Sequence, residues 1–180
     1  MDAAERATVL DPDVGPYWRL LGTLYGTMRK DVLASSLAED AFAKAVALDG
    51  KDVGARLSLA RLLMGRRAWS KALDQLEQVA RQDRRLLTRP ITVDMCHAYV
   101  ADRIAGRGEA FFREVVRAGG DSAAPKLCLA ILLRAQGGRD RGKAEEGLRV
   151  ADEVAGAANV DQEDAAYAKA LAQDWRGGAP

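Results

Sequence analysis

The sequence of 180 residues contains one histidine, His97, and two cysteines, Cys96 and Cys128. A single histidine cannot supply the paired acid–base groups of common hydrolases, and neither cysteine lies in a Cys-x-x-Cys motif. The spacing of a structural zinc site is also missing. We therefore predict no catalytic residue, no metal and no cofactor, and we expect both cysteines to be buried thiols.

The chain also has little excess charge, because 27 Lys and Arg residues face 26 Asp and Glu residues. This balance gives no whole-chain argument for a nucleic-acid partner. No apolar run reaches the roughly 18 residues of a membrane-spanning helix, so membrane insertion is not expected. The start MDAAERATVL lacks the basic and then apolar layout of a signal peptide. The compartment stays open between the cytoplasm, which is favoured, and a soluble domain of an envelope-associated protein.

Aromatic residues make up only 6% of the chain, and β-branched residues are sparse. Apolar side chains recur three and four positions apart, as at Leu57, Ala60, Leu63 and Met64. This period is that of a helix with one apolar face, and no alternating strand pattern accompanies it. The predicted fold class is all-α.

Two segments carry a repeat signature. The stretch from Trp18 to Tyr25 has the spacing W-x2-L-G-x2-Y, and the stretch from Ala38 to Phe42 has the spacing A-x3-F. They resemble the tetratricopeptide repeat, a hairpin of two helices. In this register small residues recur in the first helix, followed three positions later by large ones: Gly22, Ala60, Cys96 and Ala130, with Tyr25, Leu63, Tyr99 and Leu133. The second helices place small residues at Ala38, Ala72, Gly108 and Ala144, and bulky ones at Phe42, Leu76, Phe112 and Leu148.

The resemblance covers nearly the whole chain and implies a right-handed α-solenoid of about four tetratricopeptide hairpins in a single domain, 1–180. The expected parts are a partial repeat helix (1–12), four repeats (15–50, 53–86, 89–120 and 122–158) and a capping helix (161–176). The first repeat carries an insertion, TMRKDVLASSL, between its helices. The partial helix implies that upstream repeats were removed or that a partner covers it, which includes a homo-oligomer formed through this helix.

The resemblance assigns the concave face of the solenoid to the first helix of each repeat. The three columns of that face read Arg19, Leu57, Val93 and Leu127, then Thr23, Arg61, His97 and Ile131, then Gly26, Met64, Val100 and Arg134. This wall is apolar with interspersed arginines, which suits a peptide or helix with apolar anchors and acidic residues. It departs from the family members that clamp a terminal carboxylate with lysine and asparagine. Two alternatives stay open. The residues of these columns serve only in contacts between helices, or the C-terminal helix fills the groove.

The segment Gly137–Ala144 matches the phosphate-loop pattern G-x4-G-K. Ala144 stands where Ser or Thr would bind magnesium, and helical segments flank the motif, so a plain turn is predicted. Basic residues such as Arg67, Arg103 and Arg139 gather in the hairpin turns. They form either a rim for an acidic partner or, as we favour, the usual charge pattern of helix ends.

The leading functional hypothesis is a non-catalytic scaffold that binds a peptide or helix of a partner protein during assembly of a larger complex. One alternative is a structural or self-associating repeat segment of a longer protein. Another is a client-holding factor in bacterial cytochrome maturation or in pilus or envelope assembly. The Ala-, Arg- and Gly-rich composition suggests a bacterial source, but no residue selects a pathway.

Overall fold

The computed structural model describes residues 2–28, 32–119 and 122–177, and the regular elements in these ranges are all helices. In chain order they are α1 (Asp2–Leu10), α2 (Gly15–Gly26), α3 (Val32–Leu48), α4 (Val53–Gly65), α5 (Trp69–Gln82), η1 (Arg84–Leu86), α6 (Arg89–Ala101), α7 (Ala105–Arg117), α8 (Ala123–Gln136), α9 (Arg141–Gly156) and α10 (Gln162–Gly177). No strand occurs in these ranges, so the all-α prediction is confirmed.

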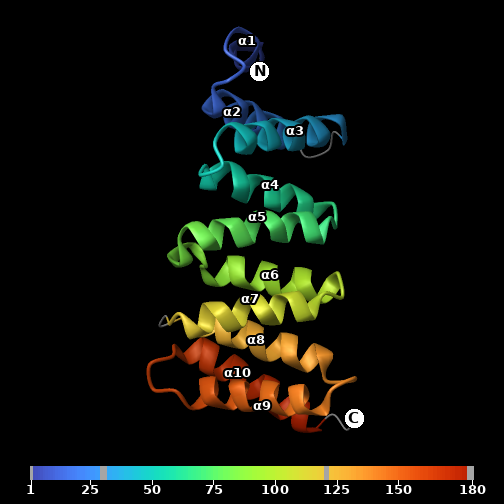
Figure 1. Ribbon diagram of the computed structural model, residues 1–180, viewed down its shortest axis with the longest axis vertical. Coiled ribbons are helices and arrows are strands. Elements are labelled where there is room, and N and C mark those ends of the chain that lie inside the picture. The colour runs from blue at the N-terminus through green and yellow to red at the C-terminus, as the bar shows by residue number, and fades with distance from the viewer. Residues whose placement is uncertain (1, 29–31, 120–121, 178–180) are drawn as a thin grey trace. The chain divides into compact units, whose positions relative to one another are not determined.

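The helices follow one another as hairpins, with α1 before the first hairpin and α10 after the last (Figure 1). The chain forms two compact units, which we call unit 1 (Met1–Arg84) and unit 2 (Arg85–Pro180). In unit 1 each helix from α1 to α5 packs against the next. In unit 2, α8 contacts α6, α7, α9 and α10 and is therefore the central helix.

The predicted insertion of the first repeat lengthens a helix. Residues 32–37 belong to the first turns of α3, which has 17 residues, whereas residues 29–31 lie outside the described residues. Elsewhere, short polar side chains and prolines define the helix starts. Asp52 caps α4 by accepting from the backbone N–H of Ala55 at 2.9 Å, and Pro16 and Pro90 occupy the first turns of α2 and α6.

The core of unit 1 is built on a close approach of α2 to α3. A β-carbon placed on Gly22 would lie 2.9 Å from the Phe42 ring, so only glycine allows this contact without a shift. Phe42 in turn belongs to a buried cluster with Leu59 and Leu63 of α4. The close contact predicted at Gly22 is thus confirmed, and it joins the first two hairpins.

The core of unit 2 uses the same principle between α6, α7 and α8. Tyr99 and Phe112 are fully buried, and their rings pack edge to face at 6.2 Å between centroids. Gly108 of α7 faces the same ring: a β-carbon there would lie 2.6 Å from Tyr99 and 2.9 Å from Leu132. Gly108, the predicted small residue of the third hairpin, therefore lies in close contact with both α6 and α8.

The fourth hairpin has two close contacts between α8 and α9. Ala144, the predicted small residue of this hairpin, lies against the end of α8: a β-carbon on Gly137 would be 2.6 Å from the Ala144 side chain. A β-carbon on Gly147 would lie 2.8 Å from the carbonyl oxygen of Ala130. The repeat register did not predict this second contact.

Two hairpin turns place an arginine in the left-handed backbone region. Arg67 follows α4 with φ 59°, and Arg103 follows α6 with φ 58°. In both turns the arginine N–H donates to the carbonyl three residues earlier, at 3.0 Å and 3.1 Å. Glycine is the usual residue in this helix-ending conformation, because side chains cost roughly 1 kcal/mol there.

Gly108→Ala should destabilise the protein, because the new methyl group meets the buried Tyr99 ring, which has no free space to enter. The matched control is Gly106→Ala in the same helix, where the nearest atom to a β-carbon is 3.6 Å away. Overpacking of this kind costs about 1–3 kcal/mol, which we expect as the difference between the two variants in urea unfolding. Equal unfolding free energies would contradict the close contact.

Candidate functional site

A largely apolar hollow of about 410 Å³ lies in unit 2 between α6, α8 and α10; we call it the α6–α8 hollow. Its lining residues are Arg89, Thr92, Val93, Cys96, His97 and Val100 of α6, Ala124, Leu127, Cys128 and Ile131 of α8, and Asp164 and Tyr167 of α10. Residues on α6 and α8 spaced three and four apart share a helix face, so the two faces form opposite walls.

Five residues of the predicted concave face meet in this hollow: Val93, His97, Val100, Leu127 and Ile131. They come from the first helices of the third and fourth predicted repeats, which pack against each other. Val93, His97 and Val100 are exposed, Ile131 is half-buried and Leu127 is buried. Their part in binding stays a prediction.

The other predicted site residues lie outside the α6–α8 hollow. Arg134 is half-buried on α8, further along the same helix. In unit 1, Arg61 is exposed, and Leu57 and Met64 are half-buried; Met64 packs against the Phe42 cluster. The last two predicted site residues, Arg19 and Thr23, are exposed on α2. Arg19 pairs with Asp52 at 3.2 Å, and the Thr23 hydroxyl donates to the Arg19 carbonyl at 2.9 Å.

The C-terminal helix α10 forms a wall of the hollow. Ala168 and Ala172 are fully buried against α8 and α9, whereas Tyr167 stands at the rim and is 47% exposed. The sequence prediction left open whether this helix fills the groove, and it did not include Tyr167. The alanines of α10 signal a helix face that packs closely on its neighbours. The residues of α10 that face α6 depend on how α10 docks, which the sequence does not show.

An ion pair holds the start of α10 beside α6. Arg89 pairs with Asp164 at 3.2 Å and with Glu163 at 2.8 Å. Burial raises the pKa of the Asp164 carboxyl, and the Arg89 guanidinium partly offsets this rise. Asp161 caps α10 by accepting from the backbone N–H of Asp164 at 2.8 Å, and this bond lowers the pKa of Asp161. The sequence analysis did not predict this polar end of the hollow, because Arg89 and Asp164 are 75 positions apart in the chain.

Three buried polar groups line the apolar part of the hollow. The hydroxyl of Thr92 is buried and has no hydrogen-bond partner among the described residues. Cys96 and Cys128 are free and buried, as predicted, and the Cys96 thiol points to the Cys128 carbonyl at 4.0 Å. Burial raises the pKa of the Cys128 thiol, so this group stays protonated and is a poor nucleophile.

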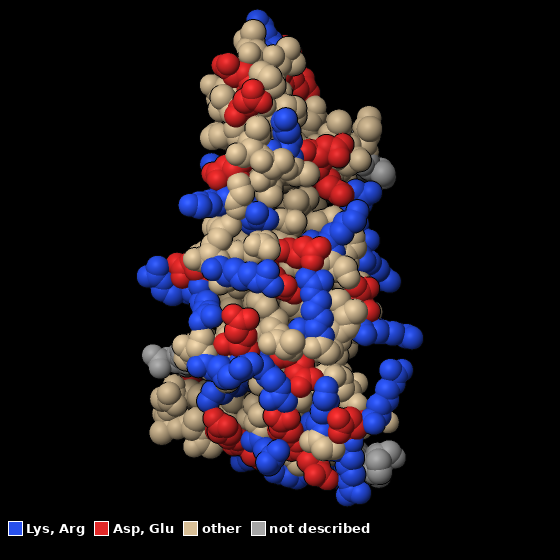
Figure 2. Space-filling view, viewed as in Figure 1, with Lys and Arg blue, Asp and Glu red and all other residues tan. Residues whose placement is uncertain are grey.

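Within the described ranges, no group of three or more His, Cys, Asp and Glu residues is placed to hold a metal ion. No helix in these ranges has both the length and the apolar character needed to cross a bilayer. Basic and acidic side chains are intermingled on the face shown in Figure 2.

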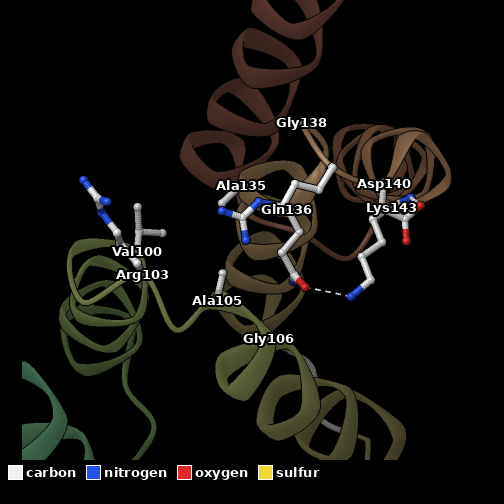
Figure 3. A pocket seen from close by; sticks show the side chains of 10 residues that line it. Val100, Arg103, Ala105, Gly106, Ala135, Gln136, Gly138, Asp140 and Lys143 are labelled. Atoms are coloured by element: carbon white, nitrogen blue, oxygen red, sulfur yellow. Dashed lines mark hydrogen bonds between the residues drawn. The ribbon is translucent and has the colours of Figure 1, made fainter.

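A second hollow of about 710 Å³ lies in unit 2 at the hairpin turns, and we call it the turn-edge hollow (Figure 3). It is lined by Val100, Arg103, Ala105, Gly106, Ala135, Gln136, Gly138, Arg139, Asp140 and Lys143. The segment Gly137–Ala144 is thus a turn and a helix start, as predicted. Asp140 caps α9 by accepting from the backbone N–H of Lys143 at 3.2 Å.

The ammonium group of Lys143 is held inside a network. It donates to Glu109 at 2.6 Å and to Gln136 at 2.7 Å. Burial tends to raise the pKa of Glu109, but hydrogen bonds from Lys143, Arg113 and Gln136 lower it overall. Arg113 also forms a two-pronged pair with Glu146, at 2.8 Å and 2.7 Å, which joins α7 to α9.

No protein-family model matches the chain, and no curated protein matches it. Among solved structures, the chain is similar to YrrB, described as a TPR protein with an unusual peptide-binding site. The two are 13% identical, the match covers 97% of this chain and 93% of that one, and the TM-score is 0.49. No residue role is carried over from YrrB.

Thr92→Val should raise the free energy of unfolding by about 1 kcal/mol, because it replaces an unpaired buried hydroxyl by a methyl group of the same shape. Thr23→Val is the control, since the Thr23 hydroxyl is exposed and hydrogen-bonded; a change within about 0.5 kcal/mol is expected there. Chemical denaturation measures both. A clear loss of stability in Thr92→Val would mean that the hydroxyl has a partner in solution.

Proposed function

We propose that the chain is a non-catalytic protein-interaction module and that the α6–α8 hollow of unit 2 binds an apolar segment of a partner protein. The observation that carries this proposal is the convergence of five residues assigned to the concave face, from Val93 to Ile131, on one hollow. An open apolar concavity between helices suits a side chain or a short segment of another protein.

Exposed apolar side chains surround the opening of the hollow. Val93 is 57% exposed, Val100 is 41% exposed, and Tyr167 is 47% exposed, and they lie on helices that face each other across the hollow. Exposed apolar side chains around a concavity favour a macromolecular partner, because a small ligand would leave the rim in water.

The chemistry of the hollow also supports binding over catalysis. The buried thiol of Cys128 is held protonated by burial, and the carboxylate of Asp164 is paired with Arg89. A nucleophilic thiol must reach its deprotonated form, which burial disfavours at Cys128, and the carboxylate of Asp164 serves to anchor α10.

To test this proposal, random dodecapeptides displayed on phage are selected on the wild-type protein, and the recovered peptides are measured by fluorescence anisotropy. We expect peptides with a large apolar residue. Val93→Asp combined with Val100→Asp should weaken their binding more than about tenfold, because a carboxylate against an apolar ligand loses water without gaining a partner.

The matched control is Leu20→Asp combined with Leu33→Asp, which adds the same two charges at apolar residues of unit 1 with 53% and 68% exposure. Thermal unfolding followed by circular dichroism checks that all variants fold. Recovery of no peptide, or equal binding to the double variant and the wild type, would overturn the proposed function.

Self-association through α1 is a second candidate function, favoured by one observation. Val9 and Leu10 at the end of α1 are 79% and 77% exposed, more than any other large apolar side chain the structure describes. If they form a contact between copies, light scattering will give a dimer mass that Val9→Asp with Leu10→Asp reduces to the monomer. A wild-type monomer at 100 µM, a concentration at which weak dimers of about 10 µM affinity would be populated, rejects this function.

A further inference from the structure

The two hollows of unit 2 share one lining residue, Val100. This residue lines both the α6–α8 hollow and the turn-edge hollow, and its side chain is exposed. Figure 3 shows Val100 next to Arg103 at the end of α6, with Gln136 and Lys143 across the turn-edge hollow. A segment that leaves the apolar hollow past Val100 therefore enters the turn-edge hollow.

The cationic groups of the turn-edge hollow differ in how they are used. Lys143 is neutralised by Glu109, and Asp140 is engaged at the start of α9. The guanidinium groups of Arg103 and Arg139, in contrast, have no ion-pair or hydrogen-bond partner among the described residues. They come from two different hairpin turns, and they leave the hollow with an excess of positive charge even though the Asp140 carboxylate also lines it.

The hairpin turn places Arg103 at the edge of this hollow. Its φ of 58° is the left-handed conformation, and Arg67 adopts the same conformation in the equivalent turn of unit 1, with φ 59°. The conformation therefore belongs to the turn. Arg67 provides a comparison for Arg103 because it has the same backbone conformation but does not line the turn-edge hollow.

We propose that the turn-edge hollow binds acidic side chains of the same partner segment whose apolar side chain occupies the α6–α8 hollow, with Arg103 and Arg139 pairing its carboxylates. This inference rests on the proposed function and specifies the partner: a segment with an apolar anchor and nearby Asp or Glu residues. Guanidinium groups bind carboxylates through two parallel hydrogen bonds, which gives both attraction and orientation.

The geometry also sets the spacing within that segment. From Val93 to Arg103 the chain advances about 15 Å at the helical rise of ~1.5 Å per residue. An extended partner covers this distance in about five residues. The acidic residues should therefore lie roughly three to seven positions from the apolar anchor, on one side of it.

The peptides recovered on the wild-type protein test this inference directly. We expect Asp and Glu to be enriched at that spacing, and Arg103→Glu with Arg139→Glu to weaken binding about tenfold at low salt, since each reversed charge repels a carboxylate. The loss should shrink at 300 mM salt. Arg67→Glu is the matched control for the single variant Arg103→Glu, because it reverses one charge in the same backbone conformation in unit 1, and it should leave binding unchanged.

The outcomes separate this inference from the function on which it rests. Peptides that need Val93 and Val100 but show no acidic enrichment, or bind Arg103→Glu/Arg139→Glu within twofold of wild type, overturn the acidic-segment assignment alone. Failure to recover any peptide overturns both. A labelled single-stranded DNA 20-mer that binds more tightly than the peptides through these arginines, or a dimer that the double variant loses, would also overturn it.

Discussion

The close approach of paired helices at residues without a side chain is the constraint on which the rest of the structure depends. Gly22 receives the ring of Phe42, Gly108 receives the ring of Tyr99, and Gly147 lets α9 reach the backbone of α8. Each contact puts a large apolar surface directly on a helix backbone, which maximises packing density. Within each unit the short helices are stabilised by such contacts between neighbouring helices, so each contact matters more than a single contact in a large common core.

These seams also determine where the candidate site lies. Gly108 and Gly147 fix α7 and α9 on α8, which leaves the remaining side of α8 for α6 and α10. Along that side, Ala124 and the two cysteine thiols are small, so the helix faces do not fill the space between them. The hollow is therefore what remains when backbone contacts elsewhere prevent α8 from moving toward α6.

The charges of the chain are organised locally, and the near-zero net charge conceals this. Arg113 joins Glu109 and Glu146 across α7 and α9, and Arg89 anchors α10 through Asp164. Ion pairs between helices orient the stack and add only modest stability where they are half-exposed. The unpaired guanidinium groups at the turns stand out against this background, because most basic residues near them have partners.

The sequence by itself determined the helical class, the close contacts at Gly22 and Gly108 and the buried state of both cysteines. It could do so because these features depend on residues three or four apart, which share a helix face whatever the helix packs against. The tertiary structure decided the rest. Gly147 added a close contact with the backbone of α8 that the repeat register did not predict, and Leu127 and Val93 line one hollow because α8 lies against α6. Tyr167 and Asp164 joined that hollow through the docking of α10, a contact between residues far apart in the chain that no local period encodes.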